Sequence, residues 1–245
     1  MGLFDFLKAK QEHPEIPVLT REDGLSQFFD HYFNKRIPVL LKGVAKDWEL
    51  MDKWSKDYIM ESSGSYVCNI ISDSRPASSK DQTTLNNYFS RVKGKSTLTL
   101  ERFDKDDFPA FLNDIPIPNE LFGMKDIARY FFFHSVTDAG TLPHNHRDAF
   151  NILQSGTKKW AFFDASQMHS PLGFKVQREF FASYPQGSHA RDWFKNELPK
   201  LGKRLPDVQT CIQEAGDIVY IPSEYSHTVL NLSEVMGLVI ERHRP

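Results

Sequence analysis

Two histidines, an aspartate and a pair of lysines lie close together in the segment GTLPHNHRDAFNILQSGTKKWAFF, residues 140–163. Metal binding by imidazole needs neutral ring nitrogens that converge on one point, and residues i and i+2 of a strand project from the same face. His144 and His146 meet this condition if this part of the chain is extended. The plainer alternative is that both are surface or core histidines near a strand start, with no ligand role.

A third ligand would have to come from another strand, and His227 is the strongest candidate. It is the first residue of the run HTVLNLS, which follows the apolar run GDIVYIP after a short loop, so it should lie where two buried strands adjoin. Neighbouring strands of a barrel bring together residues that are far apart in the sequence. The three histidines therefore indicate a candidate metal site, although His227 alone would fit a buried core position equally well.

The elements that must position these residues in the second half of the chain are short strands. Apolar runs bounded by Gly, Pro, Asp or Ser predict them, and these runs are RYFFFHSV, FNILQSG, KKWAFFDA, QTCIQEAG, DIVYIPS, HTVLNLS and MGLVIER. Gly156 with Thr157, and Gly216 with Asp217, predict two hairpins between consecutive strands. Residues 166–207 are a long polar and aromatic excursion, which we expect to be helical or looped.

The first half of the chain is mixed. Residues 22–33 space Leu and Phe at helical intervals, and WSKDYIMESSG predicts a helix with Ser55 as its N-cap and Gly64 at its end. IPVLLKG and SYVCNIIS predict strands, and LNNYFSRV predicts a short helix. Residues 73–107 otherwise look polar and turn-rich, and residues 108–122 look irregular. We therefore expect an α+β fold that is mainly β.

Composition and charge narrow the classes of function. The 30 basic and 32 acidic residues leave a formal charge of −2, so neither a nucleic-acid partner nor a membrane is expected on electrostatic grounds. Cys68 and Cys211 lack metal-type spacing, which favours a reducing compartment over a disulfide framework. The opening stretch MGLFDFLKAK carries charges that argue against a secretory signal or a membrane span. We expect a cytoplasmic protein.

Two stretches taken together resemble a known family. GTLPHNH with FNILQSGTKKWAFF, and later EAGDIVYIPSEYSHTVLNL, resemble the JmjC and cupin-like Fe(II)/2-oxoglutarate oxygenases. The upstream RIPVLLKGVAKDWELMDKW is similar to an N-terminal element of that family, so the resemblance covers most of residues 37–242. It implies a double-stranded β-helix (jelly-roll) core over residues 127–243, with an insertion at about 166–207. Residues 1–126 would be a supporting α/β part of a single domain spanning 1–245.

The resemblance implies roles for the residues at matching positions. His144 matches the first metal ligand, His227 the distal ligand, and Lys158 the lysine that binds the cosubstrate 2-oxoglutarate. The far carboxylate of 2-oxoglutarate needs a cation and a hydroxyl donor inside the barrel. The other positions expected to face the cosubstrate are Thr141, Asn151 and Asn231. Without the resemblance, Lys158 would be taken for an exposed strand lysine.

The sequence departs from the family at the second metal ligand, where the usual aspartate two residues after the first histidine is His146. If His144 and His146 both bind the metal ion, the site is a three-histidine set, and Asp148 would contact the ligands and not the metal ion. If His146 and Asp148 form the pair, the site keeps two histidines and one carboxylate, as in most non-haem Fe(II) oxygenases. The spacing to Lys158, 158 − 144 = 14 against 158 − 146 = 12, favours the three-histidine alternative.

The implied reaction uses Fe(II), 2-oxoglutarate and O₂, and it hydroxylates a substrate C–H bond while 2-oxoglutarate is decarboxylated to succinate. The substrate would be a protein or peptide side chain or a small metabolite. No basic or chromatin-reading segment accompanies the core, which favours a hydroxylase over a histone demethylase. Two rival functions stay open, a metal-binding cupin that does not use 2-oxoglutarate and a catalytically inactive binding module.

Two further expectations concern the surface of the domain. The chain ends at ERHRP directly after its last predicted strand, so we expect a monomer, with a dimer through the N-terminal half as the alternative. Aromatic residues of the insertion either shape the site entrance or form a satellite hydrophobic cluster. These residues are Phe180, Phe181, Tyr184, Trp193 and Phe194.

Overall fold

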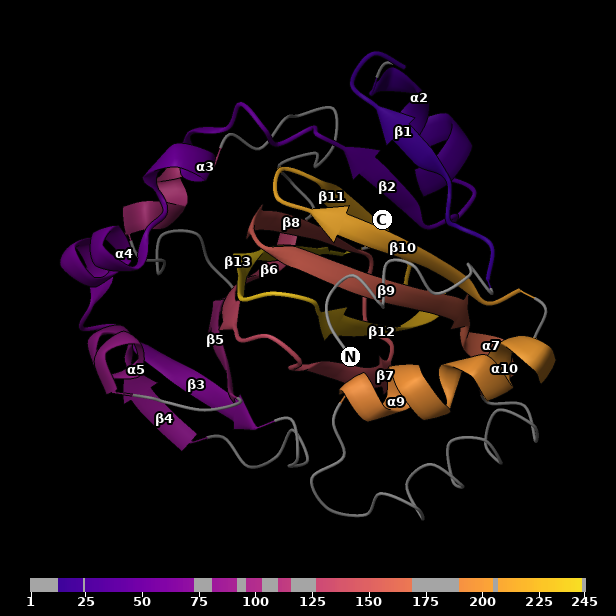
Figure 1. The fold of residues 1–245 in the computed structure, drawn as a ribbon. Helices are drawn as coiled ribbons and strands as arrows, with labels where there is room; N and C mark the ends of the chain where they lie inside the picture. Colours follow the sequence, from indigo (N-terminus) through magenta and orange to yellow (C-terminus); the bar gives the residue numbers. More distant parts are fainter. Residues whose placement is uncertain are drawn as a thin grey trace.

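Two facing β-sheets dominate the computed structural model (Figure 1). The structure describes residues 13–23, 25–72, 81–91, 96–102, 110–115, 127–168, 190–204 and 207–243. In the described part, a larger sheet has the strand order β1-β2-β11-β8-β13-β6-β5-β3-β4, and a smaller sheet has the order β10-β9-β12-β7. Of the helices in these ranges, none has the length and apolar character needed to cross a bilayer.

Eight strands of the second half form a double-stranded β-helix. They are β6 (Ile127–Ser135), β7 (Gly140–His144), β8 (Ala149–Ser155), β9 (Thr157–Asp164), β10 (Gln209–Glu214), β11 (Ile218–Ile221), β12 (Tyr225–Asn231) and β13 (Val235–Arg242). The order β11-β8-β13-β6 in one sheet faces β10-β9-β12-β7 in the other, with antiparallel pairing throughout these eight strands. The predicted mainly β class with a jelly-roll core is therefore confirmed, and so is each strand predicted in this half.

The two predicted hairpins are wrong. Strand β8 pairs with β11 and β13, whereas β9 pairs with β10 and β12, so the turn at Gly156 carries the chain from one sheet to the other. The turn at Gly216 does the same between β10 and β11. Both glycines have positive φ, of 86° and 87°, which a sharp corner needs as much as a hairpin does. The local turn signal is thus the same for the two geometries.

Strands of the first half extend the larger sheet on both sides. They are β1 (Val18–Thr20), β2 (Val39–Lys42), β3 (Val67–Ser72), β4 (Asp81–Thr84) and β5 (Ser96–Arg102). β2 adds to β11, and β5 adds to β6. The last two strands lie in the stretch predicted to be turn-rich, because their polar alternation gives little hydrophobic signal. The proposed division into a supporting part and a core stays a prediction.

Helices cover the outer face of the larger sheet. They are α2 (Ser26–Phe28), the π-helical turn η1 (Phe29–Phe33), α3 (Glu49–Lys53), α4 (Lys56–Ser63), α5 (Leu85–Arg91) and the 3₁₀ turn η2 (Ala110–Asp114). Ser55 accepts a hydrogen bond from the Tyr58 N–H and caps α4, and Gly64 follows its last residue, as predicted. One buried cluster joins Phe28 and Trp54 to Phe132 and other outward residues of the sheet. The segment 116–122, part of the predicted irregular connection, lies outside the described residues.

The space between the two sheets holds the residues that matter for function. Along β9, Trp160 and Phe162 point inward to a cluster with Ala149 and Val219 of the opposite sheet. Their neighbours Ala161 and Phe163 point outward and pack under the insertion helices. These helices are α7 (Ala165–Met168), α9 (Ala190–Asn196) and α10 (Leu198–Arg204). The alternation therefore separates an interior face from a face covered by helices.

Of the five aromatic residues singled out in the insertion, two are described. Trp193 and Phe194 are buried in the cluster under α9 and α10, together with Phe163 and Leu230. This placement supports the satellite-cluster interpretation for both. The other three, Phe180, Phe181 and Tyr184, lie outside the described residues.

Candidate functional site

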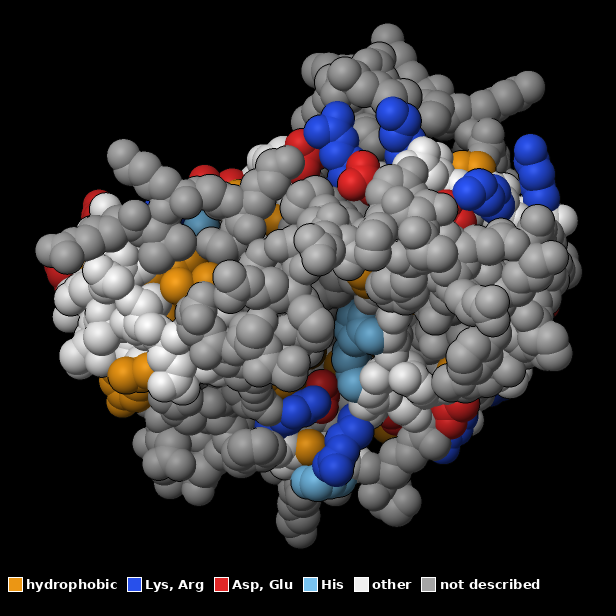
Figure 2. Space-filling view, turned by 90° about the horizontal axis from the view of Figure 1, so that it is seen from below, with side chains coloured by type: hydrophobic (Ala, Val, Ile, Leu, Met, Phe, Trp, Pro, Cys, Tyr) orange, Lys and Arg blue, Asp and Glu red, His pale blue; other side chains and the backbone are white. Residues whose placement is uncertain are grey.

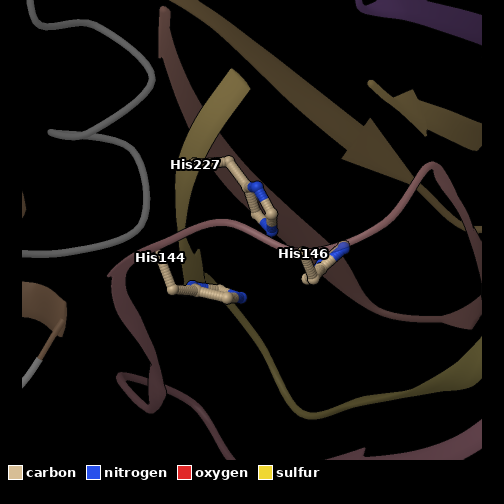
Figure 3. Close-up of side chains that lie close together, drawn as sticks. All are labelled: His144, His146 and His227. Carbon is tan, nitrogen blue, oxygen red and sulfur yellow. The ribbon is translucent and has the colours of Figure 1, made fainter. Parts of the chain in front are cut away.

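The structure brings His144, His146 and His227 together at one end of the smaller sheet (Figure 3). One potential ligand atom from each residue lies within 4.8 Å of the others. His144 is the last residue of β7 and lies directly opposite His227 on the neighbouring strand β12. His146 is not on a strand as expected but in the connection between β7 and β8. Strand pairing thus fixes two rings, and a short loop supplies the third.

The backbone around each histidine fixes its tautomer. Nδ1 of His144 lies 2.8 Å from the Leu142 carbonyl oxygen, and Nδ1 of His146 lies 2.7 Å from that of Arg147. Nδ1 of His227 lies 3.4 Å from the carbonyl oxygen of residue 225. A carbonyl oxygen can only accept, so each Nδ1 must carry the hydrogen. In the neutral rings the Nε2 lone pairs are therefore free, which is the state in which imidazole binds a metal ion.

The surroundings of His144 and His227 lower the pKa of both rings and so favour their neutral form. Burial, followed by the nearby rings of His144 and His146, lowers the pKa of His227 well below its usual range. His144 as a whole residue is exposed, yet burial of its ring, followed by the neighbouring His146, lowers its pKa to about 4. The ring of His227 also lies 5.9 Å from that of Trp160 and 6.4 Å from that of Phe162. An aromatic wall thus closes the inner side of the histidine cluster.

Asp148 is not a member of this cluster. Its side chain is 3% exposed, and its Oδ1 accepts a hydrogen bond of 2.8 Å from the Ser223 N–H. The Asp148 carbonyl oxygen accepts a second bond from the Arg242 N–H. These contacts tie the start of β8 to the connection before β12 and to the end of β13. The geometry therefore favours the three-histidine alternative over the pair of His146 with Asp148.

A different carboxylate lies close to the histidines. Glu241 on β13 is 1% exposed, and its Oε1 is 3.7 Å from Nδ1 of His146. Arg129 on β6 donates to both of its oxygens, with Nε to Oε2 at 2.7 Å and Nη2 to Oε1 at 3.0 Å. Sequence reasoning missed both residues. The alternation of RYFFFHSV and MGLVIER would have placed them on the inward face of their strands.

Lys158 occupies the interior of the barrel and not its surface. It is 5% exposed, and its Nζ lies 3.7 Å from the centre of the Phe133 ring and 5.7 Å from that of Trp160. Within the described ranges, Nζ has no hydrogen-bond acceptor or acidic partner. Burial lowers the pKa of Lys158 to about 7. A buried cation that lies against aromatic rings and has no acidic partner is costly unless an anion can reach it.

Polar residues flank Lys158 on the neighbouring strands. Asn231 of β12 and Gln213 of β10 are its direct cross-strand partners. The Oδ1 atoms of Asn231 and of Asn151 are buried and lack a hydrogen-bond partner among the described residues. Buried polar atoms without partners are rare in native proteins. They are expected where a polar ligand or water completes a pocket.

Thr141 is exposed, but it lies on the inward side of β7, because it pairs with Val229 of the interior cluster while its neighbour Leu142 packs against the outer cluster. Its carbonyl oxygen accepts from the Thr228 hydroxyl. A buried hydroxyl lies elsewhere, because Nδ2 of Asn231 donates to Oγ of Ser135 at 2.8 Å. Ser135 was not singled out in the sequence. Its signal was its place on the inward alternation of β6, two residues after Phe133.

Comparison with known proteins identifies the family. The model of the cupin-like domain matches residues 25–240. The arginine-specific demethylase JMJ22 of Arabidopsis thaliana is 24% identical over 90% of this chain and 45% of its own length. The lysine-specific demethylase JMJ21 of the same plant is 25% identical over 89% of this chain and 24% of its own.

A third relative is lysine-specific demethylase 8 of Xenopus tropicalis, 23% identical over 87% of this chain and 52% of its own length. The chain thus spans about half or less of the length of these relatives. The family match, in contrast, extends over most of the chain. The chain therefore belongs to the cupin-like domain family, within the JmjC and cupin-like group of Fe(II)/2-oxoglutarate oxygenases.

Proposed function

We propose that this protein is an Fe(II)- and 2-oxoglutarate-dependent oxygenase that hydroxylates its substrate. The observation that carries the proposal is that the interior of the barrel contains two features together. Three imidazoles lie together at the mouth, and an ammonium group without an acidic partner among the described residues lies deeper inside. A metal ion alone would use the first feature, whereas 2-oxoglutarate uses both, because its keto-acid end binds iron and its far end is a carboxylate.

The donor set fits iron. His144, His146 and His227 would supply three Nε2 atoms from one side, which leaves the other side of the ion for small ligands. Neutral nitrogen donors of this kind suit Fe(II), and they suit Zn(II), Ni(II) and Cu(II) as well. When bound together, iron, 2-oxoglutarate and O₂ would supply the oxidising chemistry, with succinate, CO₂ and a hydroxylated substrate as the products.

The pocket fits the far carboxylate of 2-oxoglutarate. Lys158 would donate to that carboxylate, and the charge-assisted bond would offset the burial of the ammonium group. Asn231 and Asn151 would line the same pocket, and Ser135 offers a hydroxyl beside Asn231. The ring of Phe133 covers one side of the ammonium group, at 3.7 Å from its centre to Nζ. We assign these roles in addition to, and not in place of, the expected role of Thr141.

A protein or peptide side chain is the first substrate class to test. The three relatives are named as arginine- or lysine-specific demethylases. Hydroxylation of an N-methyl carbon gives a product that loses formaldehyde, so one site chemistry would serve either a hydroxylase or a demethylase. A small metabolite is the second class, and a cytoplasmic location stays a prediction.

The test measures anaerobic Fe(II) and 2-oxoglutarate binding, followed by succinate release on admission of air. For the wild type we expect one Fe(II) per chain and succinate in excess of the protein. His146→Ala should lose iron binding, whereas Asp148→Asn should keep it, because the Asp148 carboxylate is engaged by the Ser223 N–H. Loss of iron with Asp148→Asn and retention with His146→Ala would establish the two-histidine, one-carboxylate alternative instead.

A second candidate function is a metal-dependent cupin that does not use 2-oxoglutarate. The observation in its favour is the absence of a carboxylate from the three-residue cluster that the described part of the chain forms. Iron binding without any 2-oxoglutarate-dependent change and without succinate would support this candidate. A wild type that binds neither metal nor 2-oxoglutarate would leave only the binding module.

A further inference from the structure

Glu241 lies on the Nδ1 side of the His146 ring, away from the nitrogen that would bind a metal ion. Its Oε1 is 3.7 Å from Nδ1 of His146, the ring nitrogen that carries the hydrogen and donates it to the Arg147 carbonyl oxygen. Nε2, the nitrogen with the free lone pair, is therefore not the atom that faces this carboxylate. Glu241 is thus placed to act on the ring of His146 and not to compete with it as a ligand.

The position of Glu241 is fixed from several sides. Arg129 and Glu241 are direct cross-strand partners on β6 and β13, and the guanidinium contacts both carboxylate oxygens. The Arg129 guanidinium also lies over the ring of Phe131, at 4.5 Å from its centre. The Glu241 side chain is 2% exposed. A carboxylate held at two oxygens in a buried place has little freedom to turn away.

A purely structural role explains these facts less well. A buried ion pair is weak evidence for stability, because the desolvation of both charges offsets much of their attraction. Strands β6 and β13 already pair along their whole length through backbone hydrogen bonds. Figure 2 shows histidine side chains reaching the surface with acidic and basic side chains next to them. Because Oε1 of Glu241 lies 3.7 Å from Nδ1 of His146, the pair lies at the candidate metal centre and not at a distant point of the sheet.

We propose that Glu241, held by Arg129, is a positioning residue of the metal centre. It orients the His146 ring from the Nδ1 side and places beside the ligands the negative charge that a set of three neutral histidines lacks. A negative charge on the Nδ1 side of a ligating histidine raises the donor strength of Nε2, and Glu241 would act in this way through its charge at 3.7 Å, since the Nδ1 hydrogen bond goes to the Arg147 carbonyl oxygen. The inference rests on the proposed function in one respect, which is that the three histidines bind a metal ion.

The test uses Glu241→Gln, which keeps the size of the side chain and an acceptor for Arg129 but removes the charge. Anaerobic titration of the metal-free protein with Co(II) should give roughly 10–100-fold weaker binding than the wild type. The visible absorption of bound Co(II) should also change, because the ligand field depends on the basicity of His146. Thermal unfolding of the metal-free proteins is recorded in parallel, so that a loss of fold is recognised.

A matched control and a second variant keep the test decisive. Glu234→Gln removes a carboxylate that contacts another histidine, His134, at 2.6 Å outside the cluster, and it should leave the Co(II) affinity unchanged. Arg129→Lys keeps the charge pair but loses the two-pronged contact, so it should change the spectrum in the same direction by a smaller amount. It replaces Glu241→Gln as the deciding variant if the latter does not fold.

The outcomes separate this inference from the function on which it rests. If the wild type binds no Co(II) or Fe(II), the proposed function fails. If the wild type binds and the Glu241→Gln protein binds equally well with the same spectrum, the role of Glu241 is overturned while the proposed function stands. If the Glu234→Gln control weakens binding as much as Glu241→Gln, the effect is general electrostatics and the inference is likewise overturned.

Discussion

Replacement of His227 with alanine is expected to abolish metal binding and succinate release. His227 is the most deeply buried of the three histidines, at 2% exposed, and it is the only one on β12. Its removal would leave two ligands on adjoining parts of β7 and the following loop. We expect the Fe(II) affinity to fall by more than about 100-fold, since loss of a supporting residue alone costs roughly 10–100-fold. Iron content after anaerobic loading and desalting measures the effect.

Metal-linked stability gives an independent measurement of the same loss. A ligand at 100 times its Kd stabilises a protein by about 2.7 kcal/mol, which for a chain of this size corresponds to a rise in Tm of roughly 5–10 °C. The wild type should show this rise with Mn(II) or Co(II), and His227→Ala should not. His134→Asn is the control, because His134 is a buried histidine bonded to Tyr88 and Glu234. An undiminished metal-induced rise in His227→Ala would contradict the assignment.

The affinity for 2-oxoglutarate should depend on pH through Lys158. Because burial lowers the pKa of the free Lys158 side chain to about 7, the side chain is a cation below that pH and increasingly neutral above it. A bound carboxylate favours the cation, so binding above pH 7 must take up a proton. The affinity should be nearly constant below about pH 7 and should fall by up to about tenfold per pH unit above it. Calorimetry in two buffers of different ionisation enthalpy counts the proton.

Removal of the Lys158 charge should eliminate this pH dependence. Lys158→Met should weaken 2-oxoglutarate binding by roughly 10–100-fold at pH 7 or below. This factor corresponds to the free energy lost with one hydrogen bond to a charged group. Lys159→Met is the matched control, because Lys159 is next in sequence and faces the opposite side of β9. An equal effect of the two variants, or an affinity that does not change with pH in the wild type, would remove Lys158 from the site.

Much of the core could be read from short apolar runs, whereas the pairing of the strands could not. Alternation and bounding turn residues located every strand from β6 to β13 except the brief β7. The glycines at positions 156 and 216 marked turns correctly, but a turn says nothing about which sheet receives the next strand. That choice depends on contacts between residues far apart in sequence, such as the pairing of β8 with β13.

The candidate site shows the same division between local and non-local information. Residue type and spacing were enough to single out His144, His146 and His227. Spacing could not decide between His146 and Asp148 as the second ligand, because that depends on the Ser223 N–H, which binds Asp148 from a distant loop. Glu241 escaped notice because a charged residue near the end of a strand normally faces solvent.

The position of Trp160 gives the site its own optical signal. Its indole lies between the two halves of the site, 5.9 Å from the His227 ring and 5.7 Å from the Lys158 ammonium group. Paramagnetic ions at the histidines would quench its fluorescence, and a carboxylate on the ammonium group would shift its emission. The remaining tryptophans pack in clusters on the outer faces of the two sheets, and they are Trp48, Trp54 and Trp193. Changes in the emission of Trp160 can therefore report the binding of the metal ion and of the cosubstrate as separate events.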